Sequence, residues 1–131
     1  EKELSNVTFI PVQPKKNMPK IIASMDASII PLKKLDLFKG ALPSKMFEAL
    51  ATELPIILSV EGEAANLINA AKAGIVVEPE NSEEMAGAVL KLSEDKELRA
   101  SFGTNGREYV TENYSRDKIT RNLENILKDI L

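Results

Sequence analysis

The chain has 131 residues and a net charge of −3, and it contains neither cysteine nor histidine. This length suits one domain with one modest core, and the weak negative charge excludes nucleic acid as an expected partner. Without Cys there is no disulfide framework or thiolate metal site, and without His the commonest metal ligand and general base are missing. We therefore expect no metal site and no cofactor. No apolar run approaches the roughly 20 residues of a membrane-spanning helix.

The first third of the chain predicts two short strands with a helix between them. Residues 7–12 and 27–32 are apolar and β-rich, whereas residues 17–25 read as a helix with Pro19 in its first turn. A polar connection over residues 33–40 follows. It carries Lys33, Lys34 and Lys39, which we interpret as a solvated loop in preference to a diphosphate-binding cluster.

Strands and helices alternate through the middle of the chain, and the last third is helical. Helices are predicted near residues 44–53 and 63–72, with apolar strands at 55–60 and 75–77. Three further helices begin near Ser82, Asp95 and Ser115, and Gly103 and Gly106 weaken the middle of the second of them. This order predicts an α/β fold with about four parallel strands, helices on both faces and a helical C-terminal end.

The most informative motif is the predicted helix start Ser44-Lys45-Met46-Phe47-Glu48. It follows the loop after the strand at 27–32, and ligands of parallel sheets bind at the carboxyl ends of strands. Ser44 and Glu48 are four residues apart, so both lie on one side of the helix. The positively charged start of the helix at Ser44 could hold a phosphate, and the Glu48 carboxylate could bind sugar hydroxyls. The alternative is a capping Ser44 and a solvated Lys45–Glu48 surface pair.

A second candidate is the turn Gly62-Glu63, which follows the strand at 55–60. Gly62 would let the backbone approach a ligand, and the amides after it start a helix. The alternative is an ordinary strand-to-helix turn in which Glu63 complements the helix dipole. The residues alone favour neither interpretation over the other.

Five segments together resemble a known family: residues 25–31, 42–51, 54–57, Gly62-Glu63 and residues 73–77. They are similar to the C-terminal donor-binding domain of a GT-B fold glycosyltransferase of family 4 (group 1). The Pro-Ser-Lys-x-Phe-Glu form at Pro43–Glu48 is closest to bacterial transferases of amino-sugars in surface-polysaccharide synthesis. The resemblance implies a Rossmann-like sheet and a UDP-sugar donor. It also implies retaining transfer of a hexosyl or N-acetylhexosaminyl group in the cytoplasm, with the inner face of the membrane as the alternative location of the full-length protein.

The resemblance also assigns roles to residues of this chain. Glu48 matches the second Glu of the family's Glu-x7-Glu motif, expected to hold the ribose hydroxyls. Ser44 and Lys45, preceded by Leu42 and Pro43, lie where the diphosphate is expected, and Gly62 and Glu63 match a loop that lines the donor pocket. Gly40 stands where the first Glu of the motif belongs, and the backbone around Gly40 and Ala41 is expected to replace it. No catalytic residue is assigned.

The chain begins at Glu1 without an initiator Met, so residues 1–131 are expected to be a nucleotide-sugar-binding domain truncated at its N-terminal side. An acceptor-binding domain would precede it, and the fragment alone would be inactive. Truncation would leave an unpaired edge near residues 7–12, through which the fragment would self-associate. Alternatives are the donor domain of a GT-B sugar-nucleotide epimerase, or a non-catalytic α/β interaction module.

Overall fold

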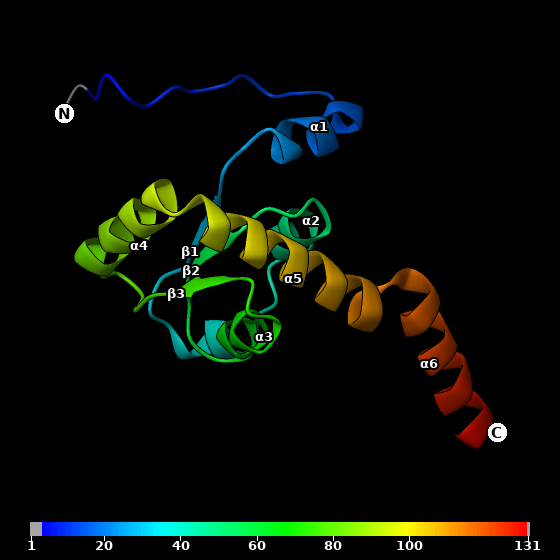
Figure 1. The fold of residues 1–131 in the computed structure, drawn as a ribbon. Helices are drawn as coiled ribbons and strands as arrows, with labels where there is room; N and C mark the ends of the chain where they lie inside the picture. Colours follow the sequence, from blue (N-terminus) through cyan, green and yellow to red (C-terminus); the bar gives the residue numbers. More distant parts are fainter. Residues whose placement is uncertain (1–3, 131) are drawn as a thin grey trace.

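An open parallel sheet forms the centre of the structure, a computed structural model that describes residues 4–130 (Figure 1). Its strands are β1 (Ser28–Pro31), β2 (Ile56–Ser59) and β3 (Gly74–Val76), in the spatial order β1-β2-β3. Ile57 pairs with Ile29 on one side and with Ile75 on the other. The predicted α/β class with a parallel, Rossmann-like sheet is confirmed. The expectation about the chain start at Glu1 lies outside the described residues.

The predicted fourth strand is wrong, because residues 7–12 pair with no other strand in the described chain. This segment runs along the outside, with Phe9 93% and Val12 100% exposed. β-Propensity reflects packing on a neighbouring strand, and here no neighbour is present to satisfy it. The unpaired edges of the sheet are therefore β1 and β3, so the edge expected near residues 7–12 is also wrong.

Helices cover both faces of the sheet, as the alternating pattern predicts. On one face Ile56 and Leu58 pack with side chains of α2 and α3, and on the other Ile57 packs with Ala88 and Leu92 of α4. The helices are η1 (Lys15–Asn17), α1 (Met18–Ala23), η2 (Asp36–Gly40), α2 (Ser44–Ala51), α3 (Glu63–Ala71), α4 (Ser82–Glu94), α5 (Lys96–Tyr114) and α6 (Arg116–Ile130). None of the described helices is long and apolar enough to cross a membrane.

The glycines of α5 do not interrupt the helix, and they allow it to pack closely on the preceding elements. A Cβ at Gly103 would lie 2.3 Å from the carbonyl oxygen of Glu53, and a Cβ at Gly106 would lie 2.7 Å from Cδ2 of Leu50. Both glycines are buried. Farther along α5, the ring of Tyr114 packs against Phe47 of α2 in a tilted arrangement, with ring centroids 5.1 Å apart. α5 therefore closes the α2–α3 face of the sheet.

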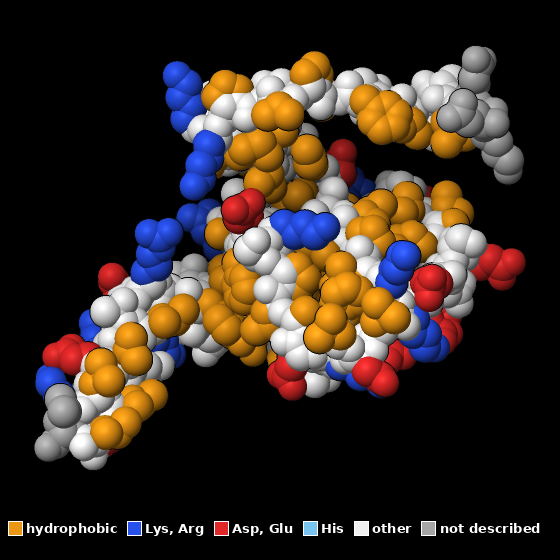
Figure 2. All heavy atoms as spheres, turned by 180° about the vertical axis from the view of Figure 1, so that it is seen from behind, with side chains coloured by type: hydrophobic (Ala, Val, Ile, Leu, Met, Phe, Trp, Pro, Cys, Tyr) orange, Lys and Arg blue, Asp and Glu red, His pale blue; other side chains and the backbone are white. Residues whose placement is uncertain are grey.

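The last helix, α6, projects beyond the rest of the structure (Figure 1). Its apolar residues recur at helical spacing, and Figure 2 shows them as an uncovered stripe along the projecting helix. They are Ile119, Leu123, Ile126, Leu127 and Ile130, all more than half exposed. The amphipathic pattern thus marks a face that no described element of this chain covers.

Candidate functional site

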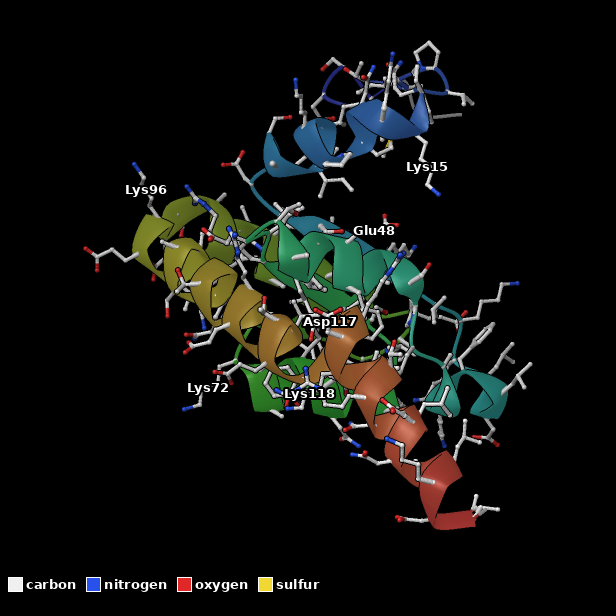
Figure 3. The ribbon with its side chains drawn as sticks, turned by 90° about the vertical axis from the view of Figure 1, so that its right-hand side faces the viewer. Lys15, Glu48, Lys72, Lys96, Asp117 and Lys118 are labelled. Carbon is white, nitrogen blue, oxygen red and sulfur yellow. The ribbon has the colours of Figure 1, made fainter. Side chains whose placement is uncertain are left out.

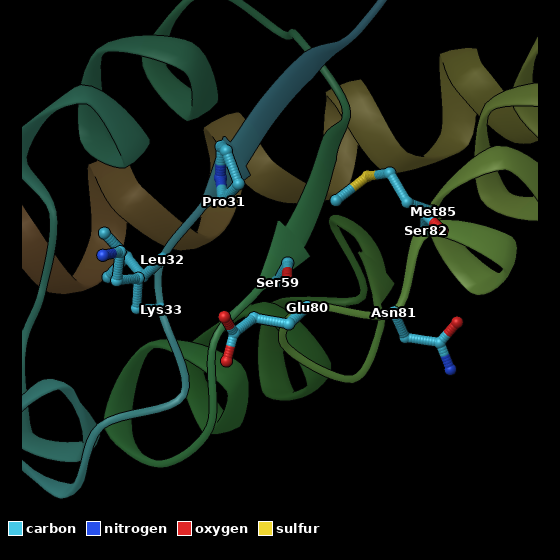
Figure 4. Close-up of a pocket in the computed structure, with 8 residues that line it drawn as sticks. All are labelled: Pro31, Leu32, Lys33, Ser59, Glu80, Asn81, Ser82 and Met85. Carbon is cyan, nitrogen blue, oxygen red and sulfur yellow. The ribbon is translucent and has the colours of Figure 1, made fainter.

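The carboxyl ends of β1 and β2 open into a hollow of about 350 Å³ (Figure 4). Its wall combines apolar groups with hydroxyl, amide and charged groups, as in small-molecule sites. Ser59, only 3% exposed, lies at the end of β2, and Met85 of α4 closes one side. The lining residues are Pro31, Leu32, Lys33, Ser59, Glu80, Asn81, Ser82 and Met85. None of the residues that the sequence singled out for donor binding is among them.

The loop between β3 and α4 shapes this hollow. Glu80 has a φ of +65°, an unusual conformation for a residue with a side chain, and its carboxylate accepts a hydrogen bond of 3.4 Å from the backbone N–H of Lys34. Asn81 caps α4 by accepting a 3.1 Å hydrogen bond from the N–H of Glu84. The cap is thus Asn81, one residue before Ser82, and Ser82 is the first residue of the helix and not its cap.

Two of the loop lysines are held by carboxylates at this end of the sheet. The Lys34 ammonium donates a 2.6 Å hydrogen bond to Glu78, and the Lys39 ammonium lies 2.8 Å from Asp36. The Glu78 carboxylate raises the pKa of Lys34, and Lys34 in turn lowers the pKa of Glu78. Asp36 likewise raises the pKa of Lys39, whose charge lowers the pKa of Asp36. These lysines thus belong to an ion-pair network and not to a freely solvated loop.

Glu61 connects the two lysines. One of its carboxylate oxygens lies 3.9 Å from the Lys34 ammonium, and the other lies 3.6 Å from the Lys39 ammonium. Lys34 and Glu78 are 44 positions apart, so no residue spacing in the sequence indicates this network. The one sequence feature that could have indicated the ion-pair network is that the loops after all three strands carry charged residues.

Ser44 and Lys45 form the first turn of α2, and both are exposed. The residue that precedes the helix is Pro43, and no side-chain cap is present, so the alternative reading of Ser44 as a cap is wrong. Within the described chain, Lys45 forms no ion pair with Glu48, so the surface-pair alternative is also not observed. Leu42 is partly exposed just before this turn.

Glu48 lies one turn farther along α2 and faces a groove between α1 and α2. In Figure 3 its side chain points toward the side on which Lys15 and α1 lie. The groove encloses about 350 Å³, enough for part of a nucleotide. Its lining residues are Lys15, Met18, Pro19, Ile22, Glu48, Ala51 and Thr52. Glu48 and the hollow at the end of β2 therefore belong to separate cavities.

Gly40 and Gly62 are brought close together by the loops after β1 and β2. Gly62 has a φ of +85°, and a Cβ there would lie only 2.1 Å from the carbonyl oxygen of Lys39. Both the conformation and the close approach require glycine. A Cβ at Gly40 would meet no atom within 4 Å, so sterics do not explain the missing Glu. Glu63 begins α3 and is exposed. No cluster of metal-ligating side chains occurs in residues 4–130.

Residues 1–109 match the protein family described as "Glycosyl transferases group 1". A GDP-mannose-dependent alpha-(1-6)-phosphatidylinositol monomannoside mannosyltransferase of Mycobacterium tuberculosis is 31% identical over 81 residues, which are 62% of this chain and 21% of that protein. The putative colanic acid biosynthesis glycosyltransferase WcaL of Salmonella typhimurium is 24% identical over 98% of this chain and 32% of its own length. The chain thus spans a fifth to a third of these relatives.

Solved structures of low sequence identity share the fold. A TarM mutant from S. aureus, crystallised with fondaparinux, alpha-GlcNAc-glycerol and UDP, superposes with a TM-score of 0.67 at 23% identity, over 83% of this chain and 21% of that one. The C-terminal domain of a glycosyl transferase group 1 family protein (LpcC) from Francisella tularensis gives a TM-score of 0.63 at 23% identity, over 84% of this chain and 53% of that one.

Proposed function

The chain belongs to the group 1 glycosyltransferases, and from this premise we propose that it binds the nucleotide-sugar donor of a transferase acting in glycoconjugate synthesis. The observation that carries the proposal is the position of Glu48. It lies on a helix that begins beyond the carboxyl end of β1, and its side chain faces a groove large enough for part of a nucleotide. A carboxylate there can accept hydrogen bonds from two vicinal ribose hydroxyls.

The remaining donor contacts are assigned along the same helix and its neighbouring loops. Ser44 and Lys45, in the exposed first turn of α2, are proposed to meet the diphosphate, where helix amides and the ammonium favour negative charge. Leu42 and Pro43 lead into that turn. Gly62 and Glu63, with the backbone at Gly40, are proposed to border the donor on the neighbouring loops.

We propose UDP as the nucleotide, on the basis of the Pro-Ser-Lys-x-Phe-Glu segment. The names of the relatives support a nucleotide-linked sugar without deciding the base, since one is GDP-mannose-dependent and another was crystallised with UDP. The proposed reaction is retaining transfer of a hexosyl or N-acetylhexosaminyl group on the cytoplasmic side. It needs an acceptor-binding domain, so residues 1–131 are proposed to bind donor without catalysing transfer.

The test is a titration of the isotope-labelled chain with UDP, GDP and ADP, followed by backbone NMR. We expect UDP at millimolar concentration to shift the amide signals of Ser44, Glu48 and Gly62 more than ADP does. Glu48→Gln should weaken UDP binding by roughly 10- to 100-fold, because a hydrogen bond to a charged group is worth about 1.5–3 kcal/mol. Glu94→Gln, an equal charge change at the far end of α4, should leave binding unchanged. Equal weakening by both variants would refute the ribose role of Glu48.

A further inference from the structure

Helix α6 leaves the body of the molecule with its apolar side uncovered. Ser115 is extended, with ψ of 146°, between the end of α5 and the start of α6, so α6 turns away from the axis of α5 (Figure 1). No described residue of α6 is buried, and none of its aliphatic residues belongs to the packed clusters of the described chain. α6 therefore carries an apolar surface separate from the core (Figure 2).

The aliphatic residues of α6 have the spacing of a helix that packs on another helix. Four of them recur after four, three and four positions, which is the alternation of the a and d positions in a heptad repeat. They are Ile119, Leu123, Ile126 and Ile130. Leu127 is also 51% exposed and widens this aliphatic stripe beside Ile126. Side chains spaced in this way fit between those of a second helix.

The charged residues of α6 repeat the same spacing on its opposite side. Four of them stand two positions before each aliphatic residue, which is about 200° around the helix. They are Asp117, Arg121, Glu124 and Lys128. The Lys128 ammonium lies 2.6 Å from the Glu124 carboxylate there. Because acids and bases alternate, this side lacks the excess of Lys and Arg that binds anionic lipid. The pattern thus favours a protein partner over a membrane.

The spacing of the aliphatic stripe is the same when it is read from either end of the helix. In an antiparallel pair of α6 helices, Ile119 would therefore face the partner's Ile130. Leu123 would likewise face the partner's Ile126, so both copies would use the same surface, as a two-fold symmetric dimer requires. The two globular bodies would lie at opposite ends of a helix pair about 22 Å long. This separation lowers the repulsion between two chains that each carry a net charge of −3.

The size of the stripe suits a weak but specific dimer. Its five aliphatic residues are 51–75% exposed. Together with their neighbours, the stripes of two copies would bury on the order of 1,000 Å², which is the lower limit for a specific protein interface. Interfaces of this size belong to weak complexes, so we expect a Kd on the order of 100 μM. At the low micromolar concentrations of an unfolding experiment the chain is then monomeric.

From these observations we propose that two copies of this chain associate through the aliphatic stripes of α6, packed antiparallel. The inference does not rest on the proposed function, because the groove that Glu48 faces is lined by residues of η1, α1 and α2 and by Thr52, and by no residue of α6. Dimer formation should therefore leave the response to UDP unchanged.

Sedimentation velocity of the whole chain, at concentrations from 5 μM to 1 mM, tests the association. We expect monomer at the lowest concentration and mainly dimer at the highest. Ile126→Lys should weaken the dimer by at least about 100-fold, because each dimer would bury two unpaired ammonium groups. Asn125→Lys is the matched control, since it adds the same charge one position earlier, outside the stripe, and should leave the Kd within two-fold. The far-UV circular dichroism of both variants should equal that of the parent.

The direction of the helices is tested with single cysteines, because the chain contains none. Positions 119 and 130 are 11 residues apart, so identical cysteines at either one would lie about 16 Å apart along an antiparallel pair, too far for a disulfide. An equimolar mixture of Ile119→Cys and Ile130→Cys, oxidised at 1 mM, should give a mixed disulfide that neither variant forms alone.

Three results would overturn the inference: a parent chain that stays monomeric at 1 mM, equal weakening by Ile126→Lys and Asn125→Lys, or disulfides formed by Ile119→Cys alone. The proposed function has a separate readout. A dimer without any UDP response would contradict only the nucleotide proposal, and UDP binding by a strictly monomeric chain would contradict only the dimer.

Discussion

Replacing Gly103 with alanine is expected to destabilise the chain, although alanine is the better helix former. In an exposed helix interior this change stabilises by up to about 1 kcal/mol. At Gly103 the new Cβ would lie 2.3 Å from the carbonyl oxygen of Glu53, whereas ordinary contact begins at 3.4 Å. The obstructing atom belongs to the backbone, so α5 or the turn after α2 has to move. Such overpacking costs typically about 1–3 kcal/mol, and after subtracting the helix gain we expect a net loss of about 1 kcal/mol.

Gly87→Ala is the matched control, because Gly87 also lies inside a helix, α4, but its Cβ would meet no atom within 4 Å. It should raise the free energy of unfolding by about 0.5–1 kcal/mol. Urea unfolding at 25 °C, followed by far-UV circular dichroism, measures both changes. The two variants should therefore move in opposite directions. A Gly103→Ala protein as stable as the parent, or more stable, would refute the close packing of α5 on the turn after α2.

Three further predictions concern the site and the surface. Gly40→Glu should fold with parental stability, because a Cβ there has open space. This variant restores the missing first Glu of the motif, and UDP-sugar affinity, measured by calorimetry, should rise. An unchanged affinity would mean that a carboxylate at this position does not contact the sugar. Lys34 lowers the pKa of Glu78, so this pair stabilises the fold above the unfolded pKa of Glu78 and loses that effect as the pH falls through the folded pKa. An NMR pH titration should show the Glu78 midpoint moving upward in Lys34→Gln. Finally, Ile126→Ala on the exposed stripe of α6 should lower the free energy of unfolding by less than about 0.5 kcal/mol. Ile68→Ala, at a fully buried position of α3, should lower it by about 2–5 kcal/mol in urea unfolding. Equal losses would mean that something covers the apolar stripe of α6.

The elements that the sequence predicted well are those whose pattern reflects their own burial. β2 is apolar at three of its four positions and buried at all four, and the apolar positions Met46 and Leu50 of α2 face the core. The segment at residues 7–12 has the same composition as a strand, yet it is exposed. Whether such a segment pairs depends on a neighbour, which its own residues do not specify.

For the candidate site, the sequence indicated individual residues, whose donor-binding roles stay predictions, and it did not indicate their arrangement. The sequence indicated Glu48, the first turn of α2 and Gly62, but it could not show that Glu48 faces α1 and not the hollow at the end of β2. It also treated Lys34 and Lys39 as solvated, because the acids that hold them come from other loops. Gly103 was taken as a weak point of a helix, since only the fold reveals the carbonyl group against which it packs.

The central position of β2 has a consequence for local motion. It is the one described strand with hydrogen-bonded neighbours on both sides, and all four of its residues are buried. Its amide protons should therefore exchange with solvent only through the largest opening events, more slowly than those at the free edges of β1 and β3. Glu61 and Gly62 follow this strand directly. The turn that leads into α3 is thus attached directly to the part of the sheet expected to exchange most slowly.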